Sequence, residues 1–213
     1  MEQLPLAGMP TKLFSCTPSR LTTWLDCPRR YRMVYLDRPV PAKGAPWAHN
    51  SFGATVHNAL RGWWDLPTAR RLPSAGRSLV DRMWIRLGYR DDEQEQQQRE
   101  RAAVMVEGYT ANLDPYDEPV GIERTVATRT ARLALSGRVD RIDRRGDELV
   151  IVDYKTGRRP CTDDEARGSL ALAAYALAAE RTCDGTAAPL NCTTCRPALW
   201  RPGRTPTSLC NVM

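Results

Sequence analysis

The alternation of apolar and polar residues is clearest in the second half of the chain, where it predicts three consecutive strands. Two of them, Val120–Thr128 and Ala131–Asp143, are rich in apolar and β-compatible residues. A turn signal at Gly146–Asp147 then separates the second strand from a third, Glu148–Thr156. We therefore expect a hairpin whose last strand is very apolar along most of its length.

Helical spacing of apolar residues accounts for most of the chain between residues 13 and 182. It predicts helices that begin at Thr17–Ser19, at Pro28 and at Asp91. A further helix begins at Phe52 with Ser51 as its cap, and another runs from Ser74 to Leu87. The last begins at Thr162 and runs on through residues 166–180. Strands and helices together predict an α/β fold. We expect a small mixed sheet flanked by helices, with a helical N-terminal part and central strands that end at Asp140 and Asp153.

An acid and a base stand at the end of the third predicted strand. Because side chains alternate along a strand, Asp153 and Lys155 share the face that carries Ile151. A surface ion pair is one interpretation. Asp140 on the preceding strand favours another, since the hairpin can bring it beside Asp153. Two carboxylates next to a lysine suit Mg²⁺ or Mn²⁺, which would polarise a phosphate and activate a water molecule.

Composition sets outer limits on the function. The chain has 213 residues, enough for one substantial core, and a formal net charge of +6 with a pI near 9.1. That charge suits a polyanionic partner without proving one. Seven cysteines, an odd number, argue against a disulfide framework. Without a membrane-length apolar run or a signal-peptide pattern, we expect a cytoplasmic protein that does not enter a membrane.

Four motifs resemble the PD-(D/E)XK nucleases, specifically their RecB-like branch. The two strongest are GRVDRID at residues 137–143 and DYKTG at residues 153–157. Gly53–His57 resembles the G-x-x-x-H helix of that branch, and Ser19–Tyr31 resembles its N-terminal segment ending in C-P-x-x-Y. The resemblance covers roughly residues 13 to 182 and implies a restriction-endonuclease-like core.

The resemblance also implies roles for individual residues. Asp140 and Asp153 would bind Mg²⁺ or Mn²⁺, with His57 and the backbone carbonyl of Tyr154 as further ligands, and Lys155 would orient the attacking water. By position alone, His57 beside an apolar helix face would be a core residue. The implied activity is a metal-dependent DNA nuclease, of the exonuclease type, in DNA repair or recombination. Its partners would be DNA and a helicase or another repair protein.

Other residues have two interpretations. Arg29 and Arg30 form a solvated helix face or contact phosphate, and Tyr31 packs or stacks on a base. Glu123 supports the site or is merely exposed. Tyr175 matches the tyrosine of the family's Q-x-x-x-Y helix and is assigned to DNA binding. Position 171 of that motif is alanine instead of glutamine, which removes any contact the glutamine would make.

Cys27 is either an ordinary half-buried cysteine or an iron–sulfur ligand. In some RecB-like relatives, including AddB-type nucleases and a CRISPR-associated exonuclease family, the matching cysteine is the first ligand of a [4Fe–4S] cluster. Three C-terminal cysteines complete that cluster. We expect it in a full-length form and not in this chain.

The last thirty or so residues lose all periodicity, so we divide the chain into three parts. Residues 1–12 are expected to be a disordered lead-in, residues 13–182 a nuclease-like domain, and residues 183–213 a non-native, disordered tail. A one-nucleotide shift of a back-translated tail restores a hairpin-like pattern, which suggests a frameshift near Thr182 and a domain that originally continued further. The alternatives are a non-catalytic DNA-binding or iron–sulfur accessory module and an inactive truncated nuclease.

Overall fold

A computed structural model describes residues 13–39, 44–157, 159, 161–188, 192–194 and 210–212 of the chain. The helices are α1 (Pro18–Asp26), α2 (Pro28–Tyr31), the π-helical turn η1 (Arg32–Leu36), α3 (Ala48–Trp64), the 3₁₀ turn η2 (Thr68–Arg70), α4 (Pro73–Arg82), α5 (Asp92–Thr110), α6 (Asp163–Arg167) and α7 (Leu170–Cys183). The strands are β1 (Phe14–Cys16), β2 (Gly121–Arg129), β3 (Leu133–Arg145), β4 (Glu148–Lys155), β5 (Thr186–Ala187), β6 (Cys192–Thr194) and β7 (Cys210–Val212).

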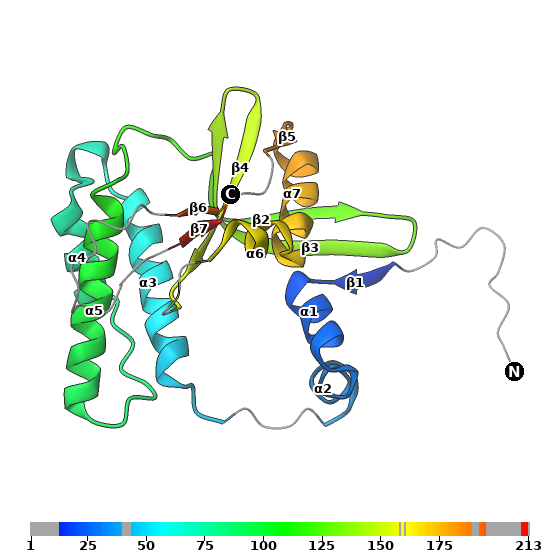
Figure 1. Cartoon of the computed structure of the whole chain (residues 1–213), viewed down its shortest axis with the longest axis horizontal. Coiled ribbons are helices and arrows are strands. Elements are labelled where there is room, and N and C mark those ends of the chain that lie inside the picture. Colours follow the sequence, from blue (N-terminus) through cyan, green and yellow to red (C-terminus); the bar gives the residue numbers. More distant parts are fainter. Residues whose placement is uncertain are drawn as a thin grey trace, which may run out of the picture.

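The strands form one mixed sheet in the order β1-β3-β4-β7-β6, with β2 paired to β3 and β5 paired to β4 (Figure 1). The pairs β1–β3 and β4–β5 are parallel, and the other four pairs are antiparallel. Helices α3, α4 and α5 pack on one face of β4, and α7 packs on the other. The prediction of an α/β fold with a restriction-endonuclease-like core is thus confirmed.

The sheet divides in the middle of β3. Along one edge β3 pairs with β2 from Ala134 to Ile142. Along its other edge it pairs with β1 over residues 133–135 and with β4 over residues 141–145, which leaves residues 136–140 between them. Beyond the pair Arg141↔Val152, β4 continues beside β7 instead. Asp140 therefore lies at this division in mid-strand, and the prediction that its strand ends there is wrong.

Two apolar cores lie on opposite faces of β4. Val150, Val152 and Tyr154 pack against α3, α4 and α5, whereas Leu149 and Ile151 pack against α7. Figure 1 shows these two groups of helices on either side of the strand. The predicted period-2 alternation of β4 is confirmed, and it leaves Asp153 and Lys155 on the α7 face.

The helix boundaries agree with the sequence where a cap decides them. Pro28 begins α2, the side chain of Asp91 caps α5, and Thr162 caps α6 in a capping box with Glu165. They differ where packing decides. Helix α3 begins at Ala48, so Ser51 is a buried residue inside the helix and not its cap.

Two helices are also shorter than predicted. The helix predicted to run to Leu87 ends at Arg82. The helix predicted through residues 166–180 is two helices, because Ser169 accepts a hydrogen bond from the backbone N–H of Leu172 and starts α7 as a new helix.

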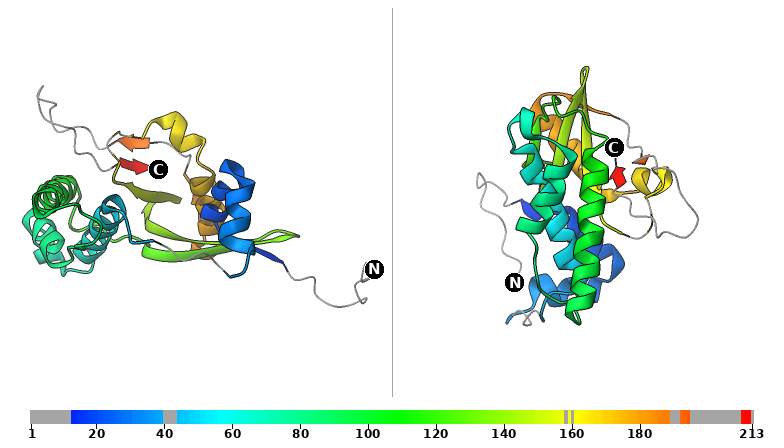
Figure 2. Two further views of the ribbon diagram at one scale, coloured as in Figure 1. Left: turned by 90° about the horizontal axis from the view of Figure 1, so that it is seen from below. Right: turned by 90° about the vertical axis from the view of Figure 1, so that its left-hand side faces the viewer.

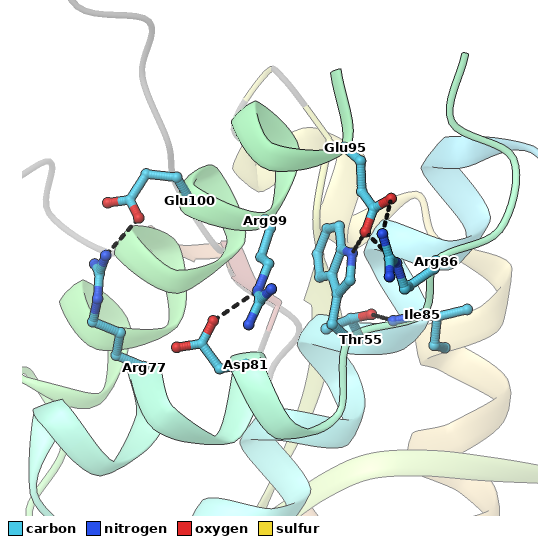
Figure 3. Close-up of polar contacts among 9 residues, drawn as sticks. Thr55, Arg77, Asp81, Ile85, Arg86, Glu95, Arg99 and Glu100 are labelled. Atoms are coloured by element: carbon cyan, nitrogen blue, oxygen red, sulfur yellow. Dashed lines mark hydrogen bonds and ion pairs between the residues drawn. The ribbon is translucent and has the colours of Figure 1, made fainter. Parts of the chain in front are cut away.

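A hairpin of α4 and α5 supports α3, the helix that carries His57. Arg77 pairs with Glu100 at 2.5 Å and Arg99 with Asp81 at 2.8 Å, which ties α4 to α5 (Figure 3). The loop between them reaches α3 directly. There the buried hydroxyl of Thr55 accepts a hydrogen bond from the backbone N–H of Ile85 at 3.2 Å (Figure 3).

Most of the predicted tail and the whole predicted lead-in, residues 1–12, lie outside the described residues. Within residues 183–213 the structure gives the end of α7 and the short strands β5, β6 and β7. The division of the chain into three parts therefore stays a prediction. Over the described residues, none of the helices has both the length and the apolar character needed to cross a membrane.

Candidate active site

The candidate site begins with two backbone groups that β3 leaves free. Where β4 separates from β3, the N–H and C=O of Tyr154 would lack ladder partners. The Asp140 carboxylate accepts a hydrogen bond from the N–H at 2.7 Å, and Nε2 of His57 lies 3.1 Å from the carbonyl oxygen. Buried backbone groups require partners. Two of the predicted site residues, together with the predicted carbonyl ligand, thus meet at the division of the sheet.

His57 is brought to this point by α3. Val56, next to it, is fully buried against the sheet, and Gly53, one turn earlier, lies close to the Thr156 hydroxyl. Nδ1 of His57 lies 3.2 Å from Oδ1 of Asp140. Both ring nitrogens therefore face oxygen acceptors, and a protonated ring donates to both.

The pKa of His57 reflects these neighbours. Burial lowers the pKa, but the hydrogen bond and charge of Asp140 raise it, as do the charges of Asp153 and Glu123, and the result lies above the ordinary histidine value. Since a ligating imidazole must give up a ring proton, a metal ion at His57 would replace this proton.

Glu123 joins the group from β2, and its backbone is strained. The pairs Ile122↔Arg141 and Arg124↔Val139 place it opposite Asp140, but its φ of +48° puts it in the left-handed region. Such a conformation costs about 1–2 kcal/mol for a non-glycine residue and gathers at functional sites. Ligand atoms of His57, Glu123 and Asp140 lie within 4.8 Å of one another.

The sequence alone allows Glu123 either a supporting role at the site or simple exposure. The structure places its side chain in the group, with 14% of its surface exposed. The available signal was the register of the β2–β3 hairpin, which sets residue 123 opposite Asp140.

Asp153 and Lys155 complete the set on the neighbouring strand. They form an ion pair with each other, and the lysine side chain is 55% exposed while the aspartate is mostly buried. Burial raises the pKa of Asp153 and the charge of Asp140 adds to that, against the opposing effect of Lys155, so the pKa lies above its usual range. The four residues predicted to be catalytic, Asp140, Asp153, Lys155 and His57, therefore lie in one electrostatically coupled group.

Tyr175 lies beside the carboxylates. Its ring packs against Gly137, where an added Cβ would lie 2.4 Å from Cε1 of the tyrosine. The pKa of Tyr175 is raised, first by burial and then by the charges of Asp153 and Asp140. The glycine of the GRVDRID motif thus leaves room for an aromatic ring at the site.

The other residues assigned to DNA lie further from this group. Arg29 and Arg30 are exposed on α2, which lies at the end of α1 that points away from the sheet (Figure 1). Tyr31 is only 7% exposed, and its ring packs against Trp24 and Tyr35 at centroid distances of 5.4 and 5.0 Å. The structure thus shows the packing interpretation for this ring, and the assignment of Tyr31 to DNA binding stays a prediction.

Cys27 is the N-cap of α2. Its sulfur accepts a hydrogen bond from the backbone N–H of Arg30 at 3.4 Å, and it is a free thiol in the part of the chain that is described. Most of the cysteine-rich tail falls outside that part. The iron–sulfur assignment of Cys27 stays a prediction.

The donor set fits a divalent cation of the Mg²⁺ or Mn²⁺ type. Asp140, Glu123 and Asp153 offer carboxylate oxygens, and Tyr154 offers a carbonyl oxygen. Hard cations prefer these ligands, and Mn²⁺ also accepts an imidazole such as that of His57. Thiols, which softer metals prefer, take no part in this group.

Comparison with known proteins agrees with this chemistry. The family model described as the PD-(D/E)XK nuclease superfamily matches residues 15–207, a range that contains every residue of the candidate site. Nucleases of this superfamily typically use divalent metal ions. A search of curated proteins found no match. Because the family match covers far more than half of its 213 residues, the chain belongs to the PD-(D/E)XK nuclease superfamily.

Proposed function

We propose that the protein is a metal-dependent DNA nuclease of the RecB-like type that hydrolyses phosphodiester bonds in DNA repair or recombination. The observation that carries the proposal is the division of the sheet at Tyr154. There Asp140 and His57 bind both backbone groups of one residue and meet Glu123 beside Asp153 and Lys155. A donor group of this kind in a chain of a nuclease superfamily supports hydrolysis.

Each residue has a proposed role. Asp140 and Asp153 would hold Mg²⁺ or Mn²⁺, with Glu123, His57 and the Tyr154 carbonyl as further donors. A bound ion supplies charge stabilisation at the phosphate. Lys155, whose ammonium is accessible, would orient the attacking water and offset negative charge that develops on the phosphate.

DNA contacts beyond the site are proposed for Arg29, Arg30 and Tyr175. Exposed guanidinium groups bind phosphate oxygens in bidentate fashion, which suits the two arginines. Tyr175 lies near both carboxylates and would contact the nucleotide that is being cleaved. The RecB-like motifs support an exonuclease that works with a helicase or another repair protein.

A cleavage assay with the full chain tests the proposal. Linear single-stranded and duplex DNA, labelled at one end, are incubated with Mg²⁺, with Mn²⁺ and with EDTA, and closed circular DNA serves as the control for end dependence. We expect linear DNA to be degraded with either ion, EDTA to stop the reaction, and excess ion to restore it. Absence of cleavage, or cleavage that EDTA leaves unchanged, would overturn the proposal.

One observation favours a second candidate, a non-catalytic DNA-binding or iron–sulfur accessory module. Ala171 stands where the RecB-like helix has glutamine, so a contact of that motif is missing. Stable DNA binding without cleavage under any of the ion conditions above would support this module, or an inactive truncated nuclease, over the enzyme.

We also propose that residues 183–213 are read out of frame and that a [4Fe–4S] cluster at Cys27 belongs to the restored protein. Leu170 and Leu177 of α7 are exposed, as expected if a covering segment is missing. The family match that extends to residue 207 and the pairing of β7 with β4 both count against the frameshift. The nucleotide sequence around codons 180 to 215 would show whether the reading frame is shifted. A brown, iron-containing protein after the frame is restored would support the cluster.

A further inference from the structure

The β2–β3 hairpin is covered by helices on one face. Val126 and Val139 are fully buried on that face, in the core shared with α7. Gly137 lies on it as well, against the Tyr175 ring of α7 and Pro18 at the start of α1. Figure 2 shows α7 and α1 on the same side of the two strands.

The opposite face of the hairpin points to solvent. Strand register pairs Thr125 with Arg138, Ala127 with Ser136 and Arg129 with Ala134, and paired residues share a face. We call these six residues the outer face of the hairpin. Thr125, Ala127, Arg129 and Arg138 are exposed, and the other two are half-buried.

The chemistry of the outer face is uniform. Its residues are two alanines, two hydroxyl residues and two arginines, and none of the six is acidic or a large apolar residue. Arg138 and Arg129 stand at its two ends, about 13 Å apart at ~3.3 Å per residue along the strands. Small side chains let an extended polymer approach the sheet, and guanidinium groups bind phosphate in bidentate geometry.

The outer face continues directly into the candidate metal group. Nε of Arg138 lies 2.8 Å from Oε2 of Glu123, its diagonal neighbour on β2. The Glu123 side chain is only 14% exposed, and one of its carboxylate oxygens lies within 4.8 Å of ligand atoms of His57 and Asp140. Arg138 is 69% exposed, so one side chain touches both the solvent face and a donor of the site.

We propose that the outer face of the β2–β3 hairpin binds the sugar–phosphate backbone of a nucleic-acid strand, with Arg138 as the phosphate contact nearest the candidate metal group. The proposal rests on the proposed function for what happens to the strand at the site. A protein partner fits this face less well, because protein interfaces depend on buried aromatic and aliphatic anchors that the six residues lack.

The ion pair with Glu123 gives Arg138 a second, opposite effect. The guanidinium competes with a cation for the Glu123 carboxylate and repels the cation electrostatically. Removal of Arg138 should therefore weaken nucleic-acid binding and strengthen metal binding. A residue with only a structural role would weaken both or change neither.

Two binding measurements on the full chain test this. Fluorescence anisotropy with a labelled 20-nucleotide single strand in EDTA, over a range of salt concentrations, reports nucleic-acid affinity without turnover. Calorimetric titration with Mn²⁺ alone reports metal affinity. The variants are Arg138→Ala, Arg138→Lys, Arg129→Ala and the control Arg145→Ala, which removes an exposed arginine from the far end of the same strand, β3.

We expect Arg138→Ala and Arg129→Ala each to lower oligonucleotide affinity by about 5-fold near 0.1 M salt and to reduce the salt slope by about 0.7, the value for one lost phosphate contact on a single strand. Arg138→Lys should keep the slope, because the charge stays. Arg138→Ala should also bind Mn²⁺ about 3-fold more tightly, since one repulsive charge near the cation is gone. Arg145→Ala should match the wild type in both measurements.

Three results would overturn the proposal: an unchanged salt slope in Arg138→Ala, an equal loss in Arg145→Ala, or Mn²⁺ affinity that falls in Arg138→Ala. The test is separate from the nuclease assay. A chain that binds strands through Arg138 but never cleaves them contradicts only the proposed function, whereas a chain that cleaves DNA with Arg138→Ala binding unaltered contradicts only this inference.

Discussion

At the scale of single residues, the side chains that bind the free backbone groups of Tyr154 are the same ones that form the candidate site. Tyr154 has an N–H and a C=O that face the division of the sheet, and Asp140 and His57 are their partners. A carboxylate and an imidazole therefore replace one rung of a β-ladder. The fold holds these two side chains in place before any ion arrives, which is the kind of preorganisation that a catalytic metal site needs.

Glu123 gives a prediction about backbone strain. At a strand position with negative φ, valine is a more stabilising residue than glycine. The φ of Glu123 is +48°, where that order is reversed. Glu123→Gly should therefore be more stable than Glu123→Val by about 1–2 kcal/mol. Urea unfolding of the two variants measures this difference, and valine as the more stable replacement would contradict the left-handed conformation.

Lys155 gives a prediction that separates metal binding from catalysis. Its ammonium is proposed to act on water and phosphate, not on the ion. Lys155→Ala should keep Mn²⁺ affinity within a few-fold of the wild type while cleavage falls about 100-fold or more, the typical effect of losing one electrostatic contact in a transition state. Calorimetry and single-turnover cleavage separate the two effects. Loss of Mn²⁺ binding as the main change would assign Lys155 a different role.

At the scale of elements, the sequence predicted the features that depend on neighbouring residues, such as strand alternation and helix caps. Alternation placed Asp153 and Lys155 on one face of β4, and the Thr162 capping box located α6, because both depend only on neighbouring residues. Ser51 shows the other case. Its burial inside α3 follows from tertiary packing that local spacing does not contain.

The same distinction holds for the site. The motifs that carry Asp140, Asp153, Lys155 and His57 predicted its members through a family resemblance. The left-handed conformation of Glu123 was not predicted. The position of Asp140 beside Tyr154 depends on where β4 leaves β3, which is a matter of pairing between strands and not of a local pattern.

The contact between the α4–α5 loop and α3 gives a prediction at this scale. Thr55→Val keeps shape but leaves the N–H of Ile85 without its acceptor, so it should cost about 1–3 kcal/mol of unfolding free energy. Thr110→Val is the matched control. The Thr110 hydroxyl donates to the Val106 carbonyl of its own helix, and that change should cost about 1 kcal/mol or less. Equal costs in urea unfolding would show that the loop contact does not hold α3.

At the scale of the whole molecule, β4 is held between two cores, and the site lies where they meet. Helix α3 brings His57 from one core, and α7 brings Tyr175 from the other. The β2–β3 hairpin adds Glu123 at the division of the sheet.

The most direct test of metal-dependent hydrolysis at this strand end is single-turnover cleavage of linear DNA by Asp153→Ala in Mg²⁺ and in Mn²⁺. Asp147→Ala, in the exposed turn between β3 and β4, is the control. A bound ion supplies several kcal/mol of transition-state stabilisation, so loss of the Asp153 carboxylate should lower the rate by about 100-fold or more while Asp147→Ala cleaves like the wild type. Cleavage by Asp153→Ala at the wild-type rate would contradict the account.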